Sequence, residues 1–301
     1  MIDPQALLRR ALPSVRQTWT ARDSILYALA VGAGQGAEAW DDTQLRFLWE
    51  QDLQALPTLA SVLGDPGFWM RESDTGLTWQ HLVHGEESVQ WLHPLPAAGQ
   101  VQATHRICRV EDRGASRGAA FVVERLLHDA SSGRSYSRAL TTVVARSDGG
   151  FSPSGGPLQS VGDAAEPALP PLPEREPDLR VTRALMSHQA LLYRQLADPN
   201  PLHVQPAAAR AAGFERPILH GMCSFGVVGL LIVNHFCHAQ AAGLKAMRAR
   251  FSAPLYPGET LQVDFWREGA VLRFRARPLG RDATALNHGW ALLADPPPNA
   301  P

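Results

Sequence analysis

A stretch dense in glycine and proline, residues 151–178, divides this 301-residue chain into two halves of similar length. Regular helices and strands seldom tolerate these two residues at such density, so the stretch is interpreted as a linker. On each side of it the same order recurs, apolar helical segments followed by strands that turn-forming residues separate. This repetition predicts an internal duplication, with units at 1–150 and 179–296 and a tail at 297–301.

The periodicity of apolar residues places the expected elements. In the first half, helices are expected over 22–30 and 56–64, and strands over 101–110, 119–127 and 135–145. In the second half, a helical or extended segment is expected at 187–196, helices at 206–213 and near 221–239, and strands at 247–253, 260–268, 270–278 and 286–293. Helices covered by antiparallel strands predict an α+β layer in each half.

Composition excludes several classes of protein. Twenty-eight basic residues face 29 acidic ones, and the net charge of −1 produces no field that would attract nucleic acid or an anionic membrane. The three cysteines form no CxxC pair, and the first residues lack the pattern of a signal peptide, so a cytoplasmic location is expected. The apolar run 218–236 contains His220 and Asn234, which favours a buried helix over a membrane span.

Three polar residues lie close together on a short segment, Asp198, Asn200 and His203. Pro199 and Pro201 exclude a regular helix interior and stiffen the loop. A carboxylate, an amide and an imidazole on a stiff loop suit proton transfer to and from a bound water. The same spacing also allows a purely structural role, in which the aspartate caps a turn and the histidine fills a partly buried position.

Gly221 stands where the long apolar helix is expected to begin. Backbone N–H groups at a helix N-terminus have no intrahelical partner and lie at the positive end of the dipole, so they can hold a developing oxyanion. Glycine would let a ligand approach without a Cβ in the way. Close packing at the helix entry explains a glycine equally well.

Two runs of the second half, 191–203 and 211–226, together resemble the signature of the MaoC-like, (R)-specific enoyl-CoA hydratases, also called hydratase 2. The segments 25–32, 56–58, 83–86, 94–96 and 250–258 are similar to the two-domain, peroxisomal-type members of that family. The resemblance implies a double hot-dog fold, in which each half is a long central helix wrapped by an antiparallel sheet.

The same resemblance implies hydration of a trans-2-enoyl-CoA to an (R)-3-hydroxyacyl-CoA, and the reverse dehydration. Asp198 and His203 would hold the catalytic water, Asn200 would help to place it, and the Gly221 N–H would form the oxyanion hole. The implied contacts with coenzyme A, which is part of the substrate and not a separate cofactor, are His84, Gly85, Arg113 and Phe251. The first half has no matching motif and would supply acyl-chain and CoA contacts, and family habit favours a homodimer.

Two departures from the family pattern concern the acyl group, Ala197 and the pair Val204-Gln205, and three alternative functions are open. Ala197 precedes Asp198 where relatives usually have glycine, which puts the local backbone shape and the preferred acyl chain in doubt. A branched or dicarboxylic acyl-CoA such as mesaconyl-CoA is an alternative substrate. A hot-dog thioesterase would place its carboxylate on the central helix and would not need the polar loop. The intact Asp198, Asn200 and His203 argue against a non-catalytic acyl-CoA binding protein.

Metal binding is not expected. His235, Cys237 and His238 are too close in sequence to point one way from a helix, even with His220 added. A thiol nucleophile at Cys223 with His220 as its partner is not expected either, because both belong to the expected buried helix entry, where an inert cysteine is common.

Overall fold

One antiparallel sheet runs through both halves of the computed structural model, which describes residues 2–36 and 40–294. Its strands are β1 (Val15–Trp19), β2 (Leu82–Trp91), β3 (Gly99–Asp112), β4 (Ala119–Asp129), β5 (Ser135–Ala145), β6 (Ser160–Gly162), β7 (Leu179–Ala184), β8 (Leu244–Phe251), β9 (Thr260–Glu268), β10 (Val271–Pro278) and β11 (Leu286–Leu293). The order is β1-β3-β4-β5-β2-β8-β11-β10-β9-β7, and β6 pairs with β3. The strands predicted from the sequence are confirmed. The predicted tail, 297–301, lies outside the described residues.

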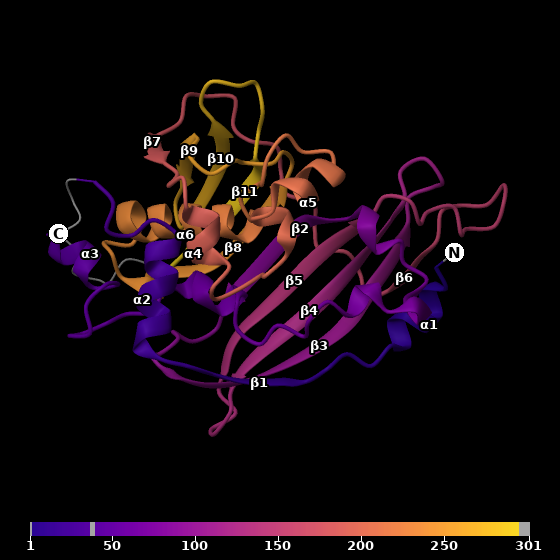
Figure 1. Cartoon of the computed structure of the whole chain (residues 1–301), viewed down its shortest axis with the longest axis horizontal. Helices are drawn as coiled ribbons and strands as arrows, with labels where there is room; N and C mark the ends of the chain where they lie inside the picture. The colour runs from indigo at the N-terminus through magenta and orange to yellow at the C-terminus, as the bar shows by residue number, and fades with distance from the viewer. Residues whose placement is uncertain (1, 37–39, 295–301) are drawn as a thin grey trace.

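Two central strands fuse the halves into this one sheet. β2 of the first half pairs with β8 of the second, so that Glu86 lies opposite Arg250. The Glu86 carboxylate accepts hydrogen bonds from Arg250, at 2.8 Å, and from Arg248. Figure 1 shows the magenta strands of the first half continuing at this junction into the orange and yellow strands of the second.

Helices cover one face of the sheet. The α-helices are α1 (Pro4–Arg9), α2 (Ala21–Ala30), α3 (Asp42–Leu45), α4 (Gln189–Tyr193), α5 (Pro206–Ala211) and α6 (Gly221–Phe236). The 3-10 helices are η2 (Pro57–Ser61), η3 (Trp69–Arg71), η4 (Ser73–Thr75), η5 (Trp79–His81), η6 (Pro201–His203) and η7 (Ala241–Gly243). In Figure 1, α2 of the first half lies beside α4 and α6 of the second, so the two halves share one core.

The long helix of the second half is α6, and most of its residues are buried. None of the helices in the described ranges is long and apolar enough to cross a membrane. The first half has no counterpart of that length among the described residues. Where a helix was predicted over 56–64, only the 3-10 helix η2 forms, and it packs against α6 at Gly229, where a Cβ would come within 2.6 Å of Thr58. The chain then turns at Gly64, whose φ of 72° favours glycine.

The segment predicted as a linker, 151–178, is held against the sheet. Its first part contains β6, and its second part crosses the sheet face that points away from α6, which we call the outer face. Side chains of the outer face donate to its backbone carbonyls: Arg248 to Pro167 at 2.8 Å, Arg273 to Pro170, and the indole of Trp266 to Arg175 at 2.8 Å. These bonds satisfy backbone carbonyl groups that lie outside any strand, in a segment whose prolines lack the N–H groups that a ladder would need.

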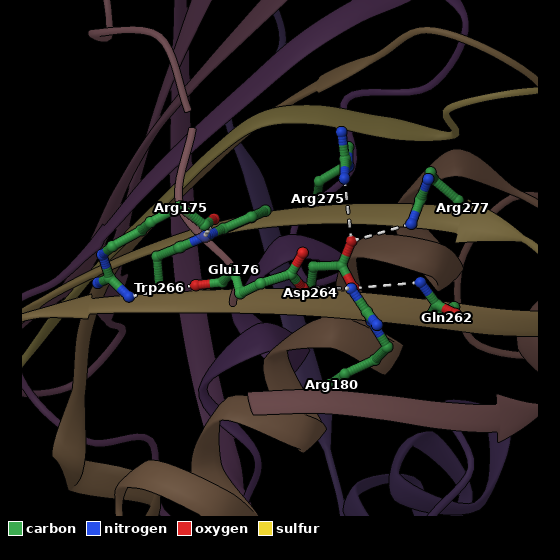
Figure 2. A network of polar contacts seen from close by, with 8 residues as sticks. All are labelled: Arg175, Glu176, Arg180, Gln262, Asp264, Trp266, Arg275 and Arg277. Atoms are coloured by element: carbon green, nitrogen blue, oxygen red, sulfur yellow. Dashed lines mark hydrogen bonds and ion pairs between the residues drawn. The ribbon is translucent and has the colours of Figure 1, made fainter. Parts of the chain in front are cut away.

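A fully buried carboxylate, Asp264, organises the outer face beside this segment (Figure 2). Its oxygens accept from Arg180 at 2.7 Å and from Arg275 and Arg277 at 3.1 Å each. Burial opposes ionisation of Asp264, but the three guanidinium groups outweigh it and lower the pKa of the carboxyl. The charge on Asp264 therefore stabilises the fold above the ordinary carboxyl pKa, and this contribution is lost as the pH falls through the lowered value.

Asp264→Ala is expected to lower the free energy of unfolding by about 2 kcal/mol, because it leaves three guanidinium groups without their shared partner. The loss stays below the upper range for buried pairs because the arginine side chains are 33–49% exposed and can rehydrate. Urea denaturation at neutral pH measures it as a lower midpoint at an unchanged slope. Asp282→Ala, on an exposed turn, is the control. An unchanged midpoint in Asp264→Ala would contradict the stabilising role of this network.

Candidate functional site

The loop that carries Asp198, Asn200 and His203 is shaped by its own side chains. The Asp198 carboxylate accepts from the N–H of Asn200 at 2.9 Å, and the Asn200 side-chain oxygen accepts from the N–H of Leu202 at 3.0 Å. Pro201 then begins η6, a position where its missing N–H costs nothing. Asp198 therefore caps a turn, which is the structural role that the spacing allowed. The second carboxylate oxygen of Asp198 and the amide nitrogen of Asn200 take no part in these two hydrogen bonds.

The loop brings the imidazole of His203 to the Asp198 carboxylate. Nε2 of His203 lies 3.7 Å from Oδ2 of Asp198, and Nδ1 lies 2.9 Å from the carbonyl oxygen of Ile218. A carbonyl only accepts, so Nδ1 carries the proton of the neutral ring and Nε2 presents a lone pair. Two acceptors therefore face each other across a gap that a donor such as water can bridge.

Environment keeps the Asp198 carboxyl ionised. Burial opposes ionisation, but His203, whenever its ring is protonated and donates from Nε2, and the N–H of Asn200 outweigh it and lower the pKa of the carboxyl. The His203 side chain is only 9% exposed, whereas that of Asp198 is 50% exposed. The pair thus combines a sheltered imidazole with a carboxylate at an open edge.

Gly221 is the first residue of α6, as predicted, so its N–H has no partner within the helix. A Cβ at this position would lie 3.0 Å from Cδ1 of Phe251, on β8. The aromatic ring thus packs against the helix entry, and a Cβ would fit there only if the ring shifted by a few tenths of an ångström. Both interpretations of this glycine, an exposed N–H and close packing, remain compatible with its surroundings.

Two of the predicted CoA contacts lie beside this entry. The ring of His84, on β2, lies 4.5 Å from that of Phe251, between centroids. Nε2 of His84 is 3.1 Å from the carboxylate of Glu87, which is buried and also accepts from Thr141 at 2.7 Å. Gly85 follows at an irregularity in the pairing of β2 with β5, where a Cβ would come within 2.8 Å of Val144, so packing accounts for this glycine.

Arg113 lies apart from these residues, on the turn between β3 and β4. β3 is three strands from β2, about 14 Å across the sheet at about 4.8 Å per strand. Arg113 and Arg117 line a surface pocket of about 290 Å³. Sequence reasoning missed Arg117, although it lies four residues from Arg113 in the same turn.

A buried carboxylate, Asp112, anchors the turn that carries the two arginines. It accepts from the N–H groups of Gly114 and Gly150 at 2.8 Å each and from the N–H and hydroxyl of Ser152 at 2.7 and 2.6 Å. Burial opposes ionisation, but the hydroxyl and the backbone donors outweigh it and hold the pKa of Asp112 well below its usual value. The pocket is therefore built on a fixed backbone.

The largest omission from the sequence prediction is His220, considered there only as a metal ligand or a partner of Cys223. Its ring stacks on that of His203, with centroids 3.7 Å apart and planes at 25°. Its Nε2 lies 3.1 Å from the carbonyl oxygen of Asp198. The dipeptide His220-Gly221 at a predicted helix start was the available signal. Cys223 is fully buried, which raises the pKa of its thiol far above the usual value and excludes an activated thiolate.

Asp198, His203 and His220 each offer a possible metal ligand atom, and these atoms lie within 4.8 Å of one another. The arrangement does not suit a metal ion. Imidazole lone pairs lie in the ring planes, and two nearly parallel rings do not aim them at one point. The Nε2 proton of His220 is moreover directed at a backbone carbonyl.

Comparisons with known proteins match both halves. Residues 17–147 match the MFE-2 hydratase 2 N-terminal domain and residues 169–283 the MaoC like domain. The 3-hydroxyacyl-thioester dehydratase Y of Mycobacterium tuberculosis is 36% identical over 93% of each chain. The peroxisomal enoyl-CoA hydratase 2 of Arabidopsis thaliana is 34% identical over 93% of this chain and 92% of its own. The MaoC-like dehydratase of Phytophthora capsici superposes with a TM-score of 0.82 at 26% identity, over 97% of this chain and 99% of its own. The predicted double hot-dog fold is confirmed.

Proposed function

This chain belongs to the MaoC-like hydratase 2 family, and on that premise we propose that it adds water to a trans-2-enoyl-CoA to give an (R)-3-hydroxyacyl-CoA. It is a hydro-lyase of the enoyl-CoA hydratase and 3-hydroxyacyl-thioester dehydratase type. The observation that carries the mechanistic proposal is the pair of proton acceptors, Asp198 and His203, facing each other beside His220, the residue that precedes Gly221.

The water molecule donates one hydrogen bond to Nε2 of His203 and one to the carboxylate of Asp198. During hydration its oxygen bonds to C3 of the enoyl group while one of these acceptors takes a proton from the water. The C2–C3 π electrons move toward the thioester carbonyl, giving an enolate whose oxygen the Gly221 N–H stabilises. A proton returned by the acid/base pair to C2 completes the addition and restores the thioester, and dehydration follows the same steps in reverse.

Asn200 completes the water site in this proposal. Its side-chain oxygen already accepts from Leu202, so the amide nitrogen is the group that can donate to the water oxygen. The water then has two acceptors for its protons and one donor to its oxygen. This arrangement directs the remaining lone pair at C3.

The turn with Arg113 and Arg117 receives the phosphates of coenzyme A in this proposal, while His84 and Phe251 contact the arm nearer the thioester. Arginine suits phosphate because its planar guanidinium donates two parallel hydrogen bonds. The pantetheine arm separates the phosphates from the thioester, in keeping with the distance across the sheet between β3 and β2.

Arg113→Gln/Arg117→Gln is expected to raise KM for crotonyl-CoA about tenfold, equivalent to about 1.4 kcal/mol, with kcat unchanged. The reason is that the lost phosphate contacts act equally in the ground and transition states. Steady-state kinetics with crotonyl-CoA and with crotonyl-pantetheine, which lacks the nucleotide, separate the two ends of the ligand. Arg134→Gln, on an exposed turn, serves as the matched control. An equal rise in KM for both thioesters would contradict a phosphate site at this turn.

The alternative activities have less support. α6 carries no carboxylate, so the residue expected of a hot-dog thioesterase is missing from the central helix. The carboxylate of Glu87 is buried beside the site, 3.1 Å from Nε2 of His84, whose ring lies 4.5 Å from that of Phe251. A second acidic group here, besides Asp198, disfavours a dicarboxylic acyl group.

A substrate panel tests the proposed function. Crotonyl-CoA, longer enoyl-CoAs and mesaconyl-CoA would be followed by loss of the conjugated thioester absorbance, with chiral analysis of the product and a parallel assay for released thiol. We expect hydration of linear enoyl-CoAs to the (R)-product without thiol release. No turnover of any chain, an (S)-product, or thiol release alone would contradict it. The expected homodimer is tested by sedimentation of the purified chain.

A further inference from the structure

One buried histidine contacts both members of the acid/base pair. His220 is 2% exposed and forms the cap of α6 immediately before Gly221. Its ring stacks on that of His203, and its Nε2 lies 3.1 Å from the carbonyl oxygen of Asp198. Because the carbonyl can only accept, Nε2 donates, so one imidazole holds the backbone of Asp198 and supports the face of His203.

The surroundings of His220 keep its ring uncharged and fixed. Burial lowers the pKa of His220 to about 4, and repulsion from His203, whenever that ring is protonated, and from Arg194 adds to the lowering. The hydrogen bond to the Asp198 carbonyl and the charge of Asp198 act the other way. The ring of Tyr193, on α4, lies 5.0 Å from that of His220, between centroids. On its other side, the ring of Tyr27, on α2, lies 6.1 Å from that of Tyr193.

This row of rings links the catalytic loop to the first half of the chain. Tyr27 and Tyr193 are each 1% exposed, so neither ring has room to turn away. On α6, a Cβ at Gly226 would come within 2.7 Å of the Tyr27 hydroxyl, so glycine there lets α2 approach. His203 is thus supported through His220 and Tyr193 by a helix of the half that has no catalytic motif.

We infer that His220 is a positioning residue for the hydration reaction: it fixes the distance and relative orientation of Asp198 and His203 while the adjacent Gly221 N–H faces the thioester. The inference rests on the proposed function of that pair. His220 takes up no proton and touches no reacting atom. It acts because a displacement of about 1 Å between reacting groups costs on the order of 100-fold in rate.

Two substitutions separate the two contacts of His220. His220→Phe keeps a ring to stack on His203 and removes the donor to Asp198, whereas His220→Gln keeps a donor near the position of Nε2 and removes the ring. Each is expected to lower kcat for crotonyl-CoA about 10- to 100-fold with KM within about twofold, and His220→Leu, which lacks both contacts, is expected to lower it further. His105→Gln is the matched control, because His105 is a partly buried histidine on β3 whose Nδ1 also lies near a backbone carbonyl, that of Pro13 at 2.9 Å.

Each kcat is divided by the folded fraction from circular dichroism, so that loss of stability is not counted as loss of positioning. A kcat per folded molecule within twofold of the parent in both His220→Phe and His220→Gln would overturn the inference. If neither variant folds, Tyr193→Leu removes the support behind His220, and an unchanged kcat there would overturn it instead. Asp198→Asn separates failure of the positioning role from failure of the proposed function. If Asp198→Asn is inactive and the His220 variants are fully active, only the positioning role is refuted. If Asp198→Asn is active, the proposed function is refuted.

Discussion

Asp198→Asn is expected to lower kcat for crotonyl-CoA hydration by about 1,000-fold while KM changes little. Asparagine has the same shape, and its side-chain oxygen can still accept from the N–H of Asn200, so the loop keeps its turn. The amide cannot take a proton from water, and it replaces one of the two acceptors that face each other across 3.7 Å. Stopped-flow or steady-state absorbance measurements give kcat and KM separately.

The control for this substitution is Asp178→Asn. Asp178 is also a carboxylate that accepts from a backbone N–H, that of Arg267 at 2.7 Å, but it lies next to β7 on the outer face. Full activity is expected there. The double variant Asp198→Asn/His203→Gln should be little slower than either single variant, because the two groups act on one water and their losses are not additive. Retention of kcat in Asp198→Asn, or fully additive losses, would remove the shared water from the mechanism.

Local patterns were sufficient to predict most of the elements and the catalytic loop. In β9, residues that face the core alternate with residues of the outer face, and this pattern alone predicts a strand. The prolines on either side of Asn200 likewise predict that the catalytic loop is not a regular helix. β2 was not predicted because charged residues such as Glu86 are not typical of a central strand. In the fold, Arg248 and Arg250 of β8 lie beside Glu86 and pair with its carboxylate. Only the tertiary fold supplies those partners.

The same limit explains what was missed in the candidate site. The role of His220 depends on stacking against a ring 17 positions earlier, and that of Glu87 on a hydrogen bond from β5. Neither is visible as a spacing. The helix predicted over 56–64 was wrong for a related reason. An apolar segment suits more than one type of helix, and the packing of Thr58 in η2 against α6 at Gly229 is a contact that only the tertiary fold supplies.

Gly221→Pro is expected to lower kcat by about 100- to 1,000-fold relative to Gly221→Ala, because proline removes the N–H proposed to hold the enolate oxygen. The backbone tolerates this change. Gly221 is the first residue of α6, where proline is favoured, and His220 before it has φ −57° and ψ 134°, which suit a residue that precedes proline. Both variants place a Cβ about 3.0 Å from the Phe251 ring, so Gly221→Ala controls for the displacement of that ring.

Binding of an acyl-CoA that cannot react separates the loss of the N–H in Gly221→Pro from steric blocking by the proline ring. An oxyanion donor acts on charge that develops only in the transition state, so the affinity for a saturated acyl-CoA, which forms no enolate, should be the same in Gly221→Pro and Gly221→Ala. Isothermal titration with butyryl-CoA measures this affinity. Weaker binding in Gly221→Pro by the same factor as its loss of kcat/KM would mean that the proline ring merely blocks the thioester. Equal affinity together with equal kcat would instead show that the glycine serves packing against Phe251, and the oxyanion donor would have to be sought elsewhere along the first turn of α6.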